Sequence, residues 1–112
     1  MSEPKAVVIL STAPSAEEAA SLAQALVSEG LVACVNLVPG VRSIYLWEGK
    51  VQDEAEHLLV IKTTPARQAE ALARLGALHS YDTPEAIALP VVGGAEPYLK
   101  WLTDVTQGAA NS

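Results

Sequence analysis

Two long runs of strand-forming residues, joined by a short polar turn, dominate the hydrophobic pattern of this chain. Between residues 41 and 47 the side chains divide between two faces of an extended strand, and Tyr45 and Trp47 fall on the same face. Glu48-Gly49 interrupts the run, and a second apolar-rich run extends from 50 to 63. The pattern predicts a β-hairpin that projects beyond what the rest of a 112-residue chain can cover. Because long exposed strand edges favour pairing, we expect a partner, in the first place a second copy of the chain.

The segments before the hairpin predict a strand, a helix and a second strand. A continuous apolar run at 6–10 is typical of a buried strand. Ser15 stands three residues before Glu18, which is the spacing of a capping box, and Glu29-Gly30 is a typical helix end. Residues 31–38 are expected to form the next strand, with Pro39-Gly40 as a bulge or bend before the hairpin strand proper.

The segments after the turn complete the set of elements. In the return strand, residues 58–61 are expected to be buried on both faces, whereas the outer half is polar. Thr64-Pro65 predicts the start of a second helix with Thr64 as its N-cap. Residues 86–89 predict a short strand near a sheet edge, stopped by Pro90. Glu96-Pro97 predicts a last helix, and 108–112 are interpreted as a frayed tail.

The order of these elements, β-α-β-β-α-β followed by one helix, defines the fold class. Right-handed crossovers fold such a chain into a four-stranded antiparallel sheet with two helices on one face. We therefore predict a single α+β domain over residues 1–112, ferredoxin-like in arrangement, with an extra C-terminal helix and a projecting hairpin.

Charge and composition narrow the classes of partner. Thirteen acidic against seven basic residues give a net charge of −6. A nucleic-acid or anionic-membrane partner is not expected, because both require a basic surface. The N-terminus lacks the regions of a signal peptide, and no apolar run approaches the roughly 20 residues needed to span a bilayer. The one cysteine, Cys34, cannot form an internal disulfide. A cytoplasmic protein is the expectation.

Few side chains are candidates for chemistry. Cys34 is interpreted as an inert buried residue, with a metal ligand or a nucleophile as the alternatives. His79 ends the second predicted helix, where it either caps the helix or binds a metal ion together with the polar loop that follows. His57 is interpreted as a solvated strand residue.

A second group of residues is a candidate for lining a cleft. Glu56 and Lys62 fall on one face of the return strand, and Tyr81 and Glu85 lie in the loop after the second helix. Simple solvation of these side chains is the alternative. No phosphate-binding loop, nucleophile motif or closed zinc-ligand spacing occurs, so the chain is not expected to be an enzyme.

Five motifs taken together resemble those of one known family. They are Ala33-Cys34-Val35-Asn36, Ser43-Ile44-Tyr45-Leu46-Trp47-Glu48-Gly49-Lys50, Ile61-Lys62-Thr63, His79-Ser80-Tyr81-Asp82-Thr83-Pro84-Glu85 and Tyr98-Leu99-Lys100-Trp101. In this order they resemble the CutA family of divalent-cation-tolerance proteins over nearly the whole chain. The family usually has proline where this chain has Ser80. Some of its members carry a cysteine at the position of Ser11 or a histidine at that of Leu78, and this chain has neither.

The resemblance implies a ferredoxin-like subunit, a homotrimer related in architecture to PII-type signalling proteins, and a link to copper or another divalent cation. His79 and Cys34 are then the candidate metal ligands, and Tyr45 and Trp47 are the expected anchors of the trimer interface. One functional hypothesis is a homotrimeric tolerance protein that binds copper or another divalent ion. The alternative is a PII-like sensor that binds a small ligand or an unidentified protein partner in clefts between subunits, without metal.

Overall fold

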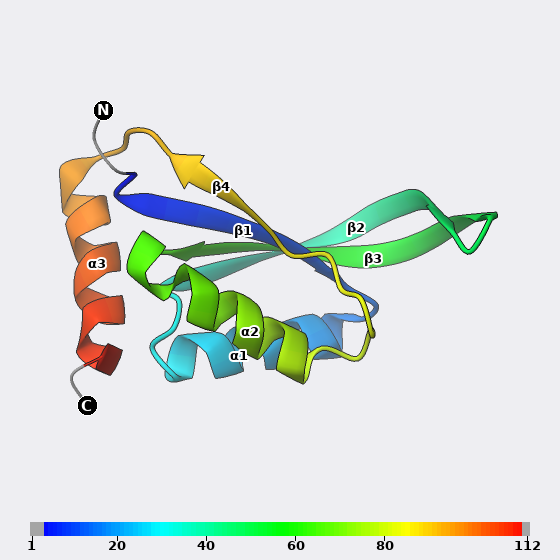
Figure 1. Cartoon of the computed structure of the whole chain (residues 1–112), viewed down its shortest axis with the longest axis horizontal. Helices are drawn as coiled ribbons and strands as arrows, with labels where there is room; N and C mark the ends of the chain where they lie inside the picture. Colours follow the sequence, from blue (N-terminus) through cyan, green and yellow to red (C-terminus); the bar gives the residue numbers. More distant parts are fainter. Residues whose placement is uncertain (1–3, 111–112) are drawn as a thin grey trace.

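The computed structural model describes residues 4–110, with side chains up to residue 107. The elements along the chain are β1 (Ala6–Ala13), α1 (Ala16–Ser28), β2 (Cys34–Trp47), β3 (Lys50–Thr63), the 3₁₀ helix η1 (Pro65–Arg67), α2 (Gln68–Leu78), β4 (Ile87–Val91) and α3 (Glu96–Ala110). The strands form one antiparallel sheet in the order β2-β3-β1-β4, and α1 and α2 lie together on one face of it (Figure 1). The predicted ferredoxin-like arrangement is confirmed.

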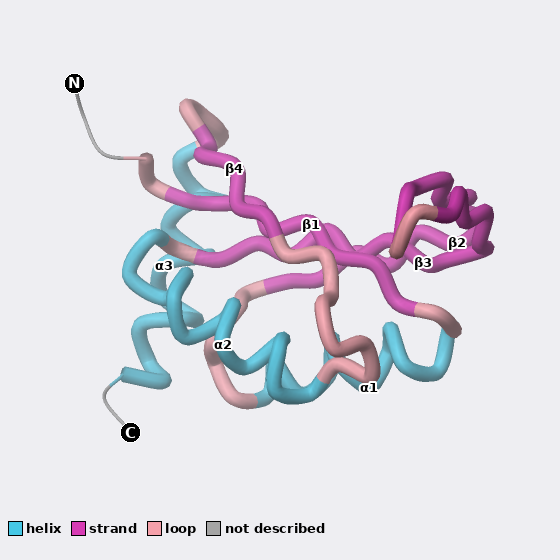
Figure 2. The backbone as a smooth tube through the Cα atoms, turned by 45° about the vertical axis from the view of Figure 1, so that its right-hand side comes forward, coloured by secondary structure: helices cyan, strands magenta, loops and turns pink. Residues whose placement is uncertain are grey.

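The hairpin of β2 and β3 is the longest feature of the sheet, and its outer half projects beyond the helices (Figure 1). Its turn consists of Glu48 and Gly49 with φ of 51° and 79°, and positive φ at both central residues is what a two-residue type I′ turn requires. A register shift between Val38 and Val41 marks the bulge predicted at Pro39-Gly40. Since bulges bend and twist a strand, the outer hairpin curls out of the line of the inner sheet (Figure 2).

The hydrophobic core fills the space between the sheet and the two helices α1 and α2. The sheet contributes Ile9, Leu59 and Ile61, and the helices contribute Leu26 and Leu75, each of which is at most 1% exposed. Leu59 and Ile61 are two residues apart on β3, so they lie on the same face of the sheet. The helices cover this face.

The opposite face of the sheet carries apolar side chains that no helix of the described chain covers. We call it the open sheet face and define it, from the strand register, as Val8, Leu10, Val38, Leu58, Val60, Ile87 and Leu89. Leu58 and Val60 are only half-buried. The prediction that residues 58–61 are buried on both faces is therefore wrong within one chain, because the two helices cover a single face.

Helix α1 begins with the predicted cap but without the reciprocal half of the capping box. The Glu18 backbone N–H donates to the Ser15 hydroxyl at 3.1 Å. The Glu18 carboxylate turns instead to the loop after α2, where it accepts a hydrogen bond from the Ser80 backbone N–H at 3.0 Å. The sequence identified the helix start correctly and misassigned the partner of this carboxylate.

Several element boundaries differ from the sequence prediction, and the strand predicted from residue 31 begins at Cys34. Thr64 forms no side-chain cap, and a short 3₁₀ helix precedes α2. Strand β4 continues through Pro90, which pairs with Val7, and this is tolerated because β4 is an edge strand. Helix α3 extends to Ala110, so the tail predicted from 108 is helical as far as it is described, and 111–112 lie outside the described residues.

Helix α3 stands across the end of the sheet at which β1 begins (Figure 1). Leu102, at 1% exposed, packs with Ala6 and Ala33, and the Arg67 guanidinium donates to the Thr106 carbonyl at 3.1 Å. Three other apolar side chains form an exposed apolar stripe on α3, with exposed fractions of 40–44%, namely Tyr98, Trp101 and Val105. No helix among residues 4–110 is long and apolar enough to cross a membrane.

Candidate functional site

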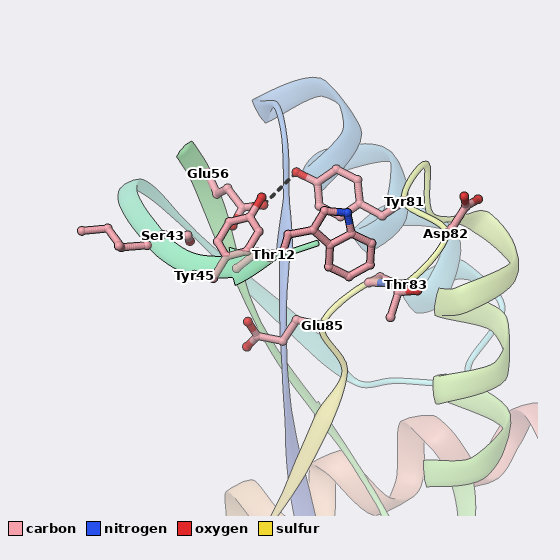
Figure 3. Close-up of a pocket in the computed structure, with 11 residues that line it drawn as sticks. Thr12, Ser43, Tyr45, Glu56, Tyr81, Asp82, Thr83 and Glu85 are labelled. Atoms are coloured by element: carbon pink, nitrogen blue, oxygen red, sulfur yellow. Dashed lines mark hydrogen bonds between the residues drawn. The ribbon is translucent and has the colours of Figure 1, made fainter. Parts of the chain in front are cut away.

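A pocket of about 710 Å³ lies where the hairpin leaves the sheet and meets the loop after α2 (Figure 3). Three parts of the chain line it: the end of β1, the outer hairpin and the loop that leads to β4. The lining residues are Thr12, Ser43, Ile44, Tyr45, Trp47, Glu56, Tyr81, Asp82, Thr83, Pro84 and Glu85. Segments far apart in the sequence therefore meet at one place, which is a typical setting for a ligand site.

Glu56 and Tyr81 form the polar centre of this pocket. Glu56 lies on β3 opposite Val41, beside the bulge, and is 6% exposed. The Tyr81 hydroxyl donates to its carboxylate at 2.8 Å (Figure 3). Burial, together with this hydrogen bond and the negative charge of Glu56, holds the pKa of Tyr81 well above its ordinary value. Tyr81 therefore stays protonated and remains a donor at every physiological pH.

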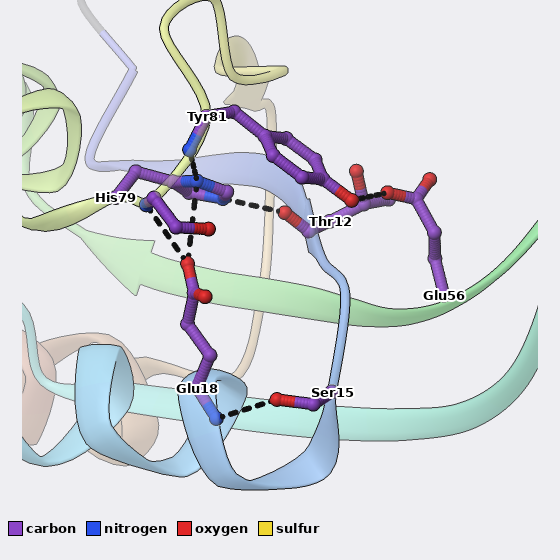
Figure 4. A network of polar contacts seen from close by, with 7 residues as sticks. Thr12, Ser15, Glu18, Glu56, His79 and Tyr81 are labelled. Atoms are coloured by element: carbon purple, nitrogen blue, oxygen red, sulfur yellow. Dashed lines mark hydrogen bonds and ion pairs between the residues drawn. The ribbon is translucent and has the colours of Figure 1, made fainter.

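His79 fixes the loop that carries Tyr81. It is the C-cap residue of α2, and its side chain is fully buried. One ring nitrogen, Nε2, lies 2.7 Å from the Thr12 carbonyl, which only accepts, so Nε2 carries the hydrogen. The other, Nδ1, accepts the Tyr81 backbone N–H at 3.1 Å. A neutral imidazole with both nitrogens engaged thus joins the end of β1 to the loop (Figure 4).

Glu18 completes this network from the side of α1 (Figure 4). Its carboxylate accepts the Ser80 N–H and lies 3.4 Å from Nδ1 of His79. Burial opposes the charged form, but the hydrogen bonds from Ser80 prevail and lower the pKa of Glu18. The start of the loop is therefore held by two elements of the fold, and Tyr81 is positioned as a consequence.

The two predicted metal ligands do not form a shared site. Cys34 pairs with Lys62, which pairs with Val8, whereas His79 contacts Thr12, four residues farther along β1. At about 3.3 Å per strand residue, the two side chains are roughly 13 Å apart along the sheet. Among the described residues no group of three or more His, Cys, Asp or Glu side chains is placed to hold a metal ion. The residues present therefore do not fit a metal centre within one chain.

Cys34 itself is half-buried beside α3 rather than enclosed in the core. Cys34 lies near Tyr98. The pKa of the Tyr98 phenol is raised, mainly by burial and in addition by Cys34. A metal-binding role for Cys34 or His79 singly stays a prediction. For His79 it would require the ring to give up its hydrogen bond with Tyr81.

Most of the predicted cleft is brought together in the pocket. Glu56, Tyr81 and Glu85 all line it, and Lys62 does not. The Lys62 ammonium donates to the side chain of Asn36. Glu56 and Lys62 share a face of β3, but six residues of strand span about 20 Å, which places them at opposite ends of the inner sheet. Strand spacing alone was a signal that could have excluded Lys62.

The aromatic residues of the pocket were singled out from the sequence, but for the subunit interface and not for a ligand site. Tyr45 and Trp47, predicted as interface anchors, line the pocket and remain 41% and 49% exposed. The alternation along β2 places them on the same face as Ser43, which sequence reasoning did not assign to the site. Thr12 was not assigned to the site either, because only the folded chain brings the end of β1 beside this loop, and Asp82 was considered only as part of the polar loop next to His79.

Comparison with known proteins identifies the family. The family model described as CutA1 divalent ion tolerance protein matches residues 7–105. The chain belongs to the CutA1 family. The divalent-cation tolerance protein CutA of Thermus thermophilus is 48% identical over 99 residues, which are 88% of this chain and 96% of that protein. The chloroplastic protein CutA of Arabidopsis thaliana is 46% identical over 101 residues, or 90% of this chain, but this chain spans only 56% of that relative's length.

A solved CutA1 family structure agrees with the fold. The crystal structure of CutA from Xylella fastidiosa superposes with a TM-score of 0.89 at 40% identity, covering 91% of this chain and 98% of that one. The sequence-based assignment to the CutA family is confirmed, and so is the arrangement of four strands and three helices.

Proposed function

We propose that this CutA1 family member acts in tolerance to divalent cations as a homotrimer that binds a small ligand in the pocket around Glu56 and Tyr81, without catalysis. The observation that carries the proposal is this pocket, whose polar centre is buried and whose loop is fixed by the network around His79. Of the two hypotheses formed from the sequence, the geometry favours the PII-like ligand sensor over a metal centre at His79 and Cys34.

The proposed assembly is supported by exposed apolar surface on three parts of the chain. The open sheet face exposes Val38, Ile87 and Leu89 at 41%, 53% and 47%. The hairpin exposes Ile44, Leu46 and Val51 at 63%, 69% and 73%, and α3 exposes its apolar stripe. Large exposed apolar side chains in this number are typical of protein interfaces. Three-fold symmetry closes such contacts into a ring that leaves no free end.

Light scattering coupled to size exclusion tests the assembly. We expect three times the mass of one chain at micromolar concentration. A species of one or two chains under these conditions would contradict the homotrimer.

Direct binding of copper or another divalent ion is the second candidate, supported by the description of the family as divalent ion tolerance proteins. Imidazole favours Cu²⁺ among the common divalent ions. Native mass spectrometry with Cu²⁺ should therefore compare the wild type with His79→Ala and Cys34→Ser, free of reducing agent. Under the ligand hypothesis we expect weak or no Cu²⁺ binding, unchanged in both variants. Loss of tight binding in either variant would favour a metal site instead.

Tolerance itself can be tested in cells that lack the protein. Growth at raised Cu²⁺ should be restored by the wild type and by Cys34→Ser, and less well by Tyr81→Phe, which removes the donor to Glu56. Full restoration by Tyr81→Phe would separate tolerance from the pocket.

A cytoplasmic location and the absence of catalysis stay expectations from the sequence, and the Arabidopsis relative is described as chloroplastic.

A further inference from the structure

We propose that the ligand of this pocket is a small organic cation that carries an ammonium group. The inference rests on the proposed ligand-binding function and adds the chemical class. Three features of the pocket carry it: the sign of its charge, its aromatic faces, and the way its carboxylates are spread rather than converged.

The charge of the pocket is negative throughout. Its lining includes the carboxylates of Glu56, Asp82 and Glu85, and includes no Lys, Arg or His side chain. Glu56 is the decisive group, because it is only 6% exposed and has no cationic side chain within 4.0 Å among the described residues. A carboxylate held away from water without a counter-charge is costly, and a cation bound beside it would offset that cost.

Two basic side chains of the sheet are engaged elsewhere, and Lys50, which lies opposite Trp47 near the hairpin turn, is not among the lining residues. Lys62 donates to Asn36 at the other end of the inner sheet, and Arg42 pairs with Asp53 at 2.6 Å. No side chain of the lining can therefore supply the missing positive charge. The three carboxylates of the lining repel an anionic ligand such as a nucleotide, so within one chain the pocket favours cationic or neutral ligands.

The aromatic side chains favour an organic cation in particular. Tyr45 and Trp47 line the same pocket as Tyr81, and the first two are 41% and 49% exposed. Faces of aromatic rings attract ammonium groups, and Trp does so most strongly. Carboxylates beside aromatic faces form the combination that recognises alkylated ammonium ions, because the rings accept the apolar substituents and the acids accept the charge.

A bare metal ion suits the pocket less well. Ca²⁺ and Mg²⁺ need about six or more oxygen ligands at roughly 2.0–2.6 Å. The carboxylates of residues 4–110 provide no converging group of three. In Figure 3 Asp82 lies on the far side of the drawn group from Glu56, while Glu85 lies on the side of Tyr45. Carboxylates spread over a cavity of about 710 Å³ can contact a larger cation at separate points.

Isothermal titration with matched probes tests the inference. Choline and putrescine are the cationic probes, 3,3-dimethylbutanol is the neutral analogue of choline, and ADP is the anionic probe. We expect the wild-type protein to bind at least one cationic probe and neither of the other two. Affinity for the cation should fall as ionic strength rises.

Two variants remove charge from the pocket without removing shape. Glu56→Gln keeps an acceptor for Tyr81, and Glu85→Gln changes an exposed position. We expect about a tenfold loss of affinity for the cationic probe in Glu56→Gln, as for a lost charge-assisted hydrogen bond, and a smaller loss in Glu85→Gln. The control Glu96→Gln makes the same change at the start of α3, outside the pocket, and should bind like the wild type.

The possible results distinguish a wrong ligand class from a wrong proposed function. If the neutral analogue binds as well as choline, or if Glu56→Gln leaves cation binding unchanged, the ammonium class is overturned. If ADP alone binds and Tyr81→Phe weakens it, the pocket function survives with another ligand class. If no cationic probe binds, the ammonium class is overturned, and if Cu²⁺ then binds through His79, the proposed function fails as well.

Discussion

Single buried hydroxyl groups in the sheet differ in whether they find a partner. Ser11 and Thr63 are both 0% exposed and both face the helices. The Thr63 hydroxyl donates to the Leu31 carbonyl at 2.7 Å. The Ser11 hydroxyl has no hydrogen-bond partner in the part of the chain that the structure describes. At this scale the same chemical group stabilises the fold at one position and costs free energy at the other.

Ser11→Ala should raise the free energy of unfolding by about 1 kcal/mol, because it removes a buried hydroxyl that gains nothing in return. The matched variant Thr63→Val should lower it by about 1 kcal/mol, since the Leu31 carbonyl loses its donor. Denaturant unfolding of both variants at one protein concentration measures the pair. A loss of stability in Ser11→Ala would show that the hydroxyl is satisfied in solution.

Glu18 predicts a dependence of stability on pH. Its pKa is lowered from 4.5 in the folded chain, so its contribution is complete above that value and is lost as the pH falls through the lowered pKa. Glu18→Gln should therefore reduce stability at neutral pH by no more than about 1 kcal/mol and weaken the acid dependence. Melting curves from neutral to acidic pH measure this effect. Glu17→Gln, which makes the same change at an exposed carboxylate in the same turn, is the matched control.

Among the elements, β2 shows how one residue controls the path of a strand. Gly40 sits at the bulge with φ of 78°, and an added Cβ would meet no atom within 4 Å there. Its conformation, and not the space around it, is therefore the constraint. Gly76 in α2 also has open space around its Cβ position but has no positive φ. The two glycines separate backbone strain from steric fit.

Gly40→Ala should lower the free energy of unfolding by about 1–2 kcal/mol, the cost of a left-handed conformation for a residue with a Cβ. Gly76→Ala should raise it by up to about 1 kcal/mol, because alanine favours a helix interior. Thermal unfolding of the two variants side by side measures the contrast. Equal effects of the same sign would contradict the role assigned to the bulge.

For the whole molecule, the exposed apolar surface links fold, assembly and site. The open sheet face, the hairpin and α3 are all left uncovered by the described chain. Trp47 belongs to the hairpin and also lines the pocket. If the trimer forms, the same aromatic residue therefore connects subunit contacts with ligand binding.

Trp47→Ala should weaken the assembly by about 2 kcal/mol or more, since large aromatic side chains are frequent anchors of interfaces. The melting temperature should fall and become dependent on protein concentration. Leu46→Ala, on the opposite face of the same strand, tests whether the effect is particular to the face of Trp47. A variant that stays trimeric on dilution, with unchanged melting, would mean that Trp47 only lines the pocket.

The sequence predicted the elements whose signals are local. The turn at Glu48-Gly49, the bulge at Pro39-Gly40 and the cap at Ser15 each depend on a few neighbouring residues, and all three are confirmed. Pro90 was misread for the opposite reason. The edge position of this strand was predicted correctly, but its continuation through Pro90 depends on pairing with β1, which is not a local signal.

The site was predictable only in part because it depends on long-range geometry. Tyr81 and Glu85 were found through their loop, and Glu56 through its polar position on a strand. The engagement of both nitrogens of His79 could not be foreseen, since one partner, the Thr12 carbonyl, lies 67 positions away in the sequence. Residues that meet only after folding leave no local pattern in the chain.

The short connection between β2 and β3 has a consequence for how the chain reaches this fold. Because two residues join these strands, their hairpin can form within microseconds from local contacts alone. An isolated hairpin is only marginally stable in water, so this one becomes stable only when β1 docks along β3 as a third strand. That docking closes the longer loop through α1 and is the slower event. Folding speed should therefore depend on side chains of β1 such as Ile9 and also on the hairpin turn, because the hairpin is already formed when β1 docks.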